Sequence, residues 1–160
     1  RIAFSPNVRS YGAIAGYTSW LGSSQGFIFE VITPGYAFLR VNNFPASPTL
    51  PASIDFGKSG VHPSISPDGT KAAFACDDGQ LCVAELSSGR IQNLYQTQWD
   101  VKVGWLERVT PVWSGDGQWI YFATVDGGDW DIFRIRPDGT GAENLTRDWP
   151  SNEINPAIRW

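Results

Sequence analysis

The chain has 160 residues, enough for one domain with a buried core, and its 42% hydrophobic and 18% charged residues are typical of a folded globular protein. A formal net charge of −4 without any run of Lys and Arg argues against a nucleic-acid partner, because phosphate binding requires clustered cations. No stretch approaches the roughly 18 apolar residues of a membrane-spanning helix.

The first predicted strand is the apolar stretch at residues 2–4, within a segment of residues 1–15 that we assign to the end of a preceding repeat. The chain begins with Arg and contains no Met, so we expect either a processed mature chain or a piece of a longer one. A weak copy of a repeat follows in residues 16–61. Its Trp20, Phe29 and Phe38 each stand 45 positions before an apolar residue of the next copy.

Two clearer copies of this repeat come next along the chain. The sequence His-Pro-Ser-Ile-Ser-Pro-Asp-Gly at 62–69 matches Thr-Pro-Val-Trp-Ser-Gly-Asp-Gly at 110–117 without a gap. After each Asp-Gly turn the pattern predicts two strands, then a turn with Gly, then a short last strand. The predicted strands are 72–75, 81–86 and a strand ending at 94 in one copy, and 120–123, 131–135 and a strand ending at 146 in the other.

The repeat then begins again at residue 155. Pro63 and Pro111 are 48 positions apart and Pro111 and Pro156 are 45 apart. A period of this length with four short strands predicts an all-β fold, a β-propeller of four-stranded antiparallel blades with about three full blades and partial ones. We place the single propeller region as 1–15 (end of a blade), 16–61, 62–108 and 109–155 (one blade each) and 156–160 (start of the next).

The repeat resembles the TolB-type WD-like propeller family. Residues 109–155 carry its pattern best, with Ser-Gly-Asp-Gly, Ile-Tyr-Phe, Asp-Ile-Phe, Asp-Gly and Asn-Leu-Thr in order, and residues 62–95 carry most of it. The resemblance implies protein binding and a periplasmic or secreted location. It also implies a second possibility, because such propellers precede the catalytic domain of some serine peptidases.

Three full units leave a propeller ring open, because propellers have about four to eight blades and an open ring exposes strand edges. We therefore expect the ring to be incomplete. Further residues or other chains are predicted to complete it.

The loop between the two clear units, 62–108 and 109–155, points to a binding surface. Leu94 and Pro111 are 17 positions apart, whereas Leu145 and Pro156 are only 11 apart. Loops between blades gather on one face, where insertions often carry binding, and Trp and Arg are favoured interface residues. Packing of these tryptophans against a core edge is the alternative. The predicted partner-binding residues are Trp99, Asp100, Trp105, Arg108 and Trp149.

The two cysteines, Cys76 and Cys82, flank an Asp-Gly hairpin signal. They form either a cross-hairpin disulfide or two unreactive strand thiols, because the spacing alone does not decide whether they face each other. Two thiols and one distant His do not make a zinc site.

No constellation predicts an enzyme. Ser24 lies in a Gly-x-Ser-x-Gly sequence, but a strand follows it and the only histidine, His62, occupies a repeat position. The carboxylates of residues 126–131 lack the spacing of a calcium loop. The sequence therefore predicts a non-enzymatic protein-interaction scaffold without a cofactor, working outside the cytoplasm. The alternative is an accessory propeller domain of a larger enzyme, for example a serine peptidase.

Overall fold

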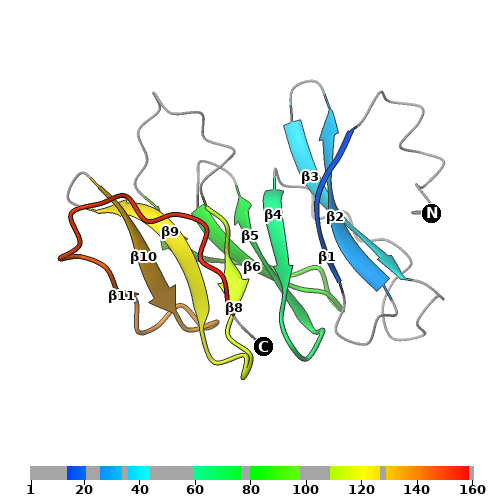
Figure 1. Ribbon diagram of the computed structural model, residues 1–160. Coiled ribbons are helices and arrows are strands. Elements are labelled where there is room, and N and C mark those ends of the chain that lie inside the picture. Colours follow the sequence, from blue (N-terminus) through cyan, green and yellow to red (C-terminus); the bar gives the residue numbers. More distant parts are fainter. Residues whose placement is uncertain are drawn as a thin grey trace.

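Three antiparallel sheets and no helix make up the part of the chain that the computed structural model describes, which is residues 14–20, 26–33, 36–43, 60–76, 80–97, 109–126 and 129–158. The sheets stand side by side in chain order (Figure 1). No helix in these residues is long and apolar enough to cross a membrane.

The first sheet, sheet A, has the strand order β1-β2-β3 within the described residues. Its strands are β1 (Ile14–Trp20), β2 (Gly26–Thr33) and β3 (Tyr36–Asn43). Both pairings are antiparallel, and the register of β1 shifts between Ala15 and Thr18.

Sheets B and C are the four-stranded antiparallel blades that the repeat predicts. Sheet B consists of β4 (Gly60–Ile65), β5 (Lys71–Cys76), β6 (Gln80–Glu85) and β7 (Ile91–Gln96). Sheet C consists of β8 (Val112–Trp113), β9 (Ile120–Asp126), β10 (Asp129–Ile135) and β11 (Glu143–Asn144). In each sheet the strands lie in sequence order, while the exact blade boundaries along the chain stay a prediction.

The Asp-Gly turns have the geometry that their residue types favour. Gly69 and Gly117 have φ of 72° and 68°, which glycine adopts without steric cost, and each amide donates to the carbonyl of the Ser three positions earlier. The Asp68 carboxylate accepts hydrogen bonds from the Ser66 hydroxyl at 2.6 Å and from the Thr70 amide at 3.1 Å, so it stabilises its own turn.

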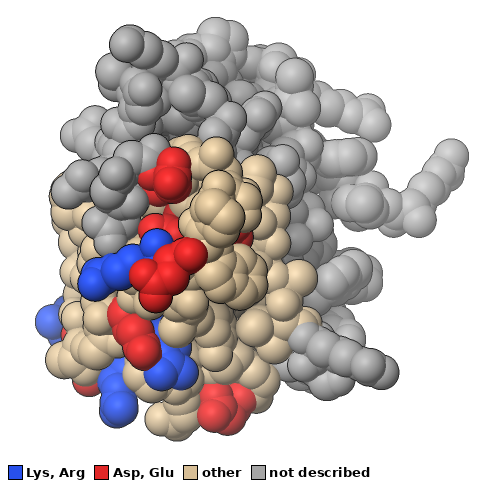
Figure 2. Space-filling view, turned by 60° about the vertical axis from the view of Figure 1, so that its left-hand side comes forward, with Lys and Arg blue, Asp and Glu red and all other residues tan. Residues whose placement is uncertain are grey.

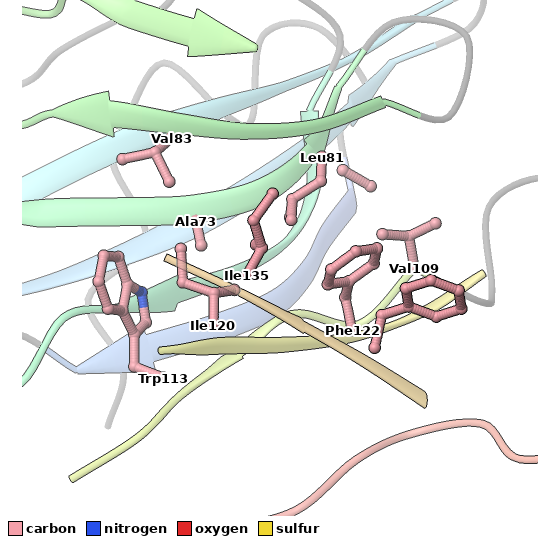
Figure 3. Close-up of a cluster of buried hydrophobic side chains, with 10 residues drawn as sticks. Ala73, Leu81, Val83, Val109, Trp113, Ile120, Phe122 and Ile135 are labelled. Carbon is pink, nitrogen blue, oxygen red and sulfur yellow. The ribbon is translucent and has the colours of Figure 1, made fainter. Parts of the chain in front are cut away.

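Sheets B and C pack face to face through an apolar core (Figure 3). Alternate residues of each strand point into it, as a pleated sheet requires. Its aromatic centre is Tyr95, Phe122 and Phe133, whose ring centroids lie 5.2 to 5.8 Å apart. The buried members of this core are Ala73, Ala75, Leu81, Val83, Val109, Trp113, Ile120, Phe122, Phe133 and Ile135.

Trp113 ties the two sheets together by a polar contact as well. Its ring is 1% exposed, and its Nε1–H donates to the carbonyl of Ser64 on β4 at 3.0 Å. A buried indole N–H without a partner costs about 1–3 kcal/mol, so this bond fixes where β8 lies against β4.

The other face of sheet B carries a second core and the disulfide. Cys76 and Cys82 are joined, with their Cα atoms 5.9 Å apart, among buried residues that include Phe74 and Leu86. The sequence left a bridge and two separate thiols as alternatives, and the structure has the bridge. The bond connects β5 to β6 diagonally, because Cys82 is paired with Phe74 rather than with Cys76.

Candidate binding surface

Where the structure describes side-chain burial, which begins at residue 60, the exposed large hydrophobic side chains come from one short segment after β11. They are Leu145, Trp149 and Ile154, with exposed fractions of 39%, 58% and 43%. Isolated exposed apolar residues are common on proteins, but a cluster along one loop marks a candidate interaction site. Trp149 is the largest of the three and the most exposed.

A buried polar network anchors the start of this loop. Asp131 on β10 is 3% exposed and accepts two hydrogen bonds, from the Thr146 hydroxyl at 2.9 Å and from the Asn144 amide at 2.8 Å. The Thr146 oxygen in turn accepts the Ile132 amide at 3.0 Å. At Thr146 the Ile132 amide therefore bonds to a side-chain oxygen and not to a backbone carbonyl. The prediction that the last strand reaches Thr146 is wrong, because β11 ends at Asn144.

Backbone bonds hold the rest of the loop. The Trp149 amide donates to the Thr146 carbonyl at 2.8 Å, which forms a turn directly after the buried anchor. Farther along, the Glu153 amide donates to the carbonyl of Trp130 at 2.7 Å, and the Asn152 side chain accepts the Trp130 amide at 2.9 Å. Trp149 therefore lies between two segments of the loop that are fixed by hydrogen bonds.

Charged residues flank the tryptophan. Arg147 and Asp148 are both exposed on the same loop. On the face in Figure 2, acidic and basic side chains alternate without a large area of one sign. Aromatic residues with polar neighbours are common in protein-binding contacts.

The other predicted binding residues, Trp99, Asp100, Trp105 and Arg108, lie outside the described residues. Their grouping with Trp149 on one face stays a prediction. Leu145 and Ile154 were not among the predicted binding residues. Leu145 was expected to lie in the last strand. The exposure of Leu145 and Ile154 could have been inferred from their positions beside turns, after a β-strand has ended.

The residues weighed for chemistry have structural places in the described part of the chain. His62 is 6% exposed with φ of 54°, at a bulge in β4, and Asn155 at the matching repeat position has φ of 56°. Both oxygens of Asp131 accept hydrogen bonds, one from Asn144 and one from Thr146. Among the described residues, no three His, Cys, Asp or Glu side chains gather to hold a metal ion. Ser24 lies outside them.

Asn144 of the Asn-Leu-Thr sequence is also engaged. Its amide nitrogen donates to Asp131, and its side-chain oxygen accepts the Thr146 amide at 3.0 Å. A glycan on this nitrogen would break the anchor of the loop.

Comparison with known proteins identifies the fold. An uncharacterized protein of Agrobacterium fabrum is 26% identical over an alignment of 140 residues, which covers 73% of this chain and 47% of that protein. The chain thus spans about half the length of the curated relative that it matches. No protein-family model matches the chain.

Solved structures agree on a β-propeller. TolB from Acinetobacter baumannii superposes with a TM-score of 0.65 at 14% identity, over 83% of this chain and 32% of that one. The tricorn protease gives a TM-score of 0.66 at 15% identity, over 90% of this chain and 14% of that one. The predicted TolB-like β-propeller fold is confirmed, and the chain corresponds to a part of a propeller.

Proposed function

We propose that this chain is a non-enzymatic scaffold for protein–protein interaction, of the TolB-like propeller type, which binds its partner through the inter-blade loops on one face. The observation that carries the proposal is Trp149, which is 58% exposed on a loop fixed at both ends. The proposed site adds Trp99, Asp100, Trp105 and Arg108 from the preceding inter-blade loop.

The energetics of such a tryptophan favour binding. An aromatic ring of this size buries about 150–250 Å² in an interface, and a central Trp often contributes 2 kcal/mol or more to affinity. The loop amides of Trp149 and Glu153 already donate to the carbonyls of Thr146 and Trp130, so little conformational entropy is lost when a partner covers the loop.

The disulfide supports a location outside the cytoplasm. The bond between Cys76 and Cys82 persists in oxidising compartments, whereas cytoplasmic thiols are kept reduced in most organisms. We therefore propose a periplasmic or secreted protein.

Site-specific photo-crosslinking tests the proposal in cells. The photoreactive residue p-benzoylphenylalanine replaces Trp149 in the full-length protein. The matched control carries it at Gln118, an exposed position at the opposite end of sheet C. We expect an adduct of increased mass, containing one reproducible partner protein, from position 149 only. Equal adducts from both positions, or none, would contradict a specific binding face.

The alternative function is an accessory propeller that positions a catalytic domain elsewhere in the same protein. The structural similarity to part of the tricorn protease supports this alternative. The same experiment separates the two functions, because an accessory propeller gives a crosslink within one polypeptide, without a gain in mass. Labelling of the full-length protein by a fluorophosphonate probe would support a serine peptidase.

A further inference from the structure

A small surface pocket of about 90 Å³ opens at the end of the interface between sheets B and C. Strands β5, β6 and β7 provide most of its wall, and the turn after β10 provides the rest. The lining residues are Lys71, Val83, Glu85, Arg90, Gln92 and Pro137.

Strand register explains the pocket. Lys71 is paired with Glu85 and Val83 with Gln92, so the side chains continue the sheet face whose inner part is the apolar core. The turn from sheet C closes one side, since Gln92 donates to the carbonyl of Asp138 at 3.2 Å. The interface therefore ends with an apolar floor, Val83 at 5% exposed, and a charged rim.

Neither cation of this rim forms a close ion pair among the described residues, although Lys71 attracts the Asp68 carboxylate electrostatically. Neither Lys71 nor Arg90 has a carboxylate oxygen within 4.0 Å among the described residues. In sheet C, by contrast, Arg134 and Glu143 form a salt bridge. Nearby carboxylates are bound otherwise. Asp138 accepts two bonds from Thr140, at 2.7 and 2.9 Å.

Glu85 is the remaining acid of the pocket, and it accepts the Ser88 hydroxyl at 3.1 Å. The pocket thus contains two cations and one carboxylate.

The corresponding position in sheet C shows the same kind of site with a cation paired to a carboxylate. Trp119 corresponds to Lys71, because each amide donates to the Ser hydroxyl that begins its turn, at 2.9 Å in both. From the same register, Arg134 corresponds to Val83 and Glu143 to Gln92.

In sheet C the cations contact an aromatic ring and a carboxylate of the same sheet. Arg134 and Arg136 lie over the Trp119 ring, with Cζ at 4.3 and 4.9 Å from its centroid. The Glu143 carboxylate binds Arg134 at 2.6 Å. An aromatic ring and a paired carboxylate therefore complete this cluster. The pocket in sheet B has Lys71 in place of Trp119 and Gln92 in place of Glu143, and its own acid, Glu85, forms no salt bridge with the two cations among the described residues.

We propose that the pocket in sheet B binds the side chain of a glutamate in a segment of a partner protein. The carboxylate accepts hydrogen bonds from Lys71 and Arg90, and its methylene groups pack on Val83 and Pro137. This is the chemistry that Glu143 and Trp119 provide in sheet C. The pocket is a second contact, at the opposite end of the sheets from the Trp149 loop, so it does not depend on that loop.

Titration of the isotope-labelled full-length protein with blocked tripeptides tests the pocket, with amide chemical shifts measured by NMR at low salt. The probes are acetyl-Gly-Glu-Gly-amide, its Gln analogue and sodium acetate. We expect the Glu peptide to shift the amides of residues 71, 83–92 and 138–139 in a saturable way. The Gln peptide and acetate should bind at least tenfold more weakly.

Three variants assign the contacts. Lys71→Gln and Arg90→Gln should each weaken the Glu peptide about tenfold, the equivalent of one charge-assisted hydrogen bond. Arg134→Gln is the matched control, because it removes the same charge from sheet C, outside the pocket lining, and should leave the affinity unchanged. Thermal melting confirms that all three fold.

Several results would overturn the proposal. Equal binding of the Glu and Gln peptides would show that the carboxylate is not recognised. Acetate binding as tightly as the Glu peptide would indicate a general anion site. An equal loss in Arg134→Gln would indicate non-specific attraction. Each outcome is independent of crosslinking at Trp149, so the two proposals fail separately.

Discussion

Replacing Asp131 by Ala removes the acceptor on which the Trp149 loop depends. The Thr146 hydroxyl and the Asn144 amide would lose bonds of 2.9 and 2.8 Å in a site where Asp131 is 3% exposed. A buried donor left without its acceptor costs about 1–3 kcal/mol, so we expect the two lost bonds to lower the free energy of unfolding by about 3 kcal/mol. Asp131→Asn keeps one acceptor and should cost about half as much.

Urea denaturation of the full-length protein measures this loss, with Asp129→Ala as the matched control. Asp129 is the exposed first residue of the same strand, so its replacement should change stability by less than about 0.5 kcal/mol. Hydrogen exchange followed by mass spectrometry should show faster exchange in residues 145–154 of the Ala variant. If that variant is as stable as the control, or destabilised with unchanged exchange in the loop, the anchoring argument is wrong.

Further predictions concern the core, the disulfide and pH. Phe122→Ala should lower the unfolding free energy by about 3–5 kcal/mol in the same urea assay, because the ring is fully buried. Cys76→Ala with Cys82→Ala should lower it by about 2 kcal/mol, since the bridge closes a short loop. The Ser114 hydroxyl lowers the pKa of Asp116 from 3.8, so Asp116 stabilises the fold above that pH and this is lost as pH falls below it. Stability of Asp116→Asn should therefore fall less between pH 5 and 2, as thermal melting would show.

Local chemistry explains why the fold could be predicted. The Asp-Gly turns at Gly69 and Gly117 depend on residues adjacent in sequence, so their positive φ follows from residue type. The period of the repeat then gives the sheets and their order. The loop position of Trp149 could be predicted because this residue follows the last strand of a unit, but its exposure could not.

Features that depend on register could not be predicted. The contact between Asp131 and Thr146 needs the pairing of β10 with β11 and the early end of β11. The cysteine pair stayed open for the same reason, since the bridge is diagonal across the hairpin. The pocket beside Lys71 needs a turn from the next sheet, which no local pattern reveals.

Hydroxyl-radical footprinting of the full-length protein, alone and bound to its crosslinked partner, tests the scaffold function most directly. Oxidation of Trp149, which is 58% exposed in the free chain, should fall at least fivefold in the complex. Oxidation of Trp119, at the opposite end of sheet C, serves as the internal reference and should not change. Equal oxidation of Trp149 with and without the partner would contradict binding through this loop.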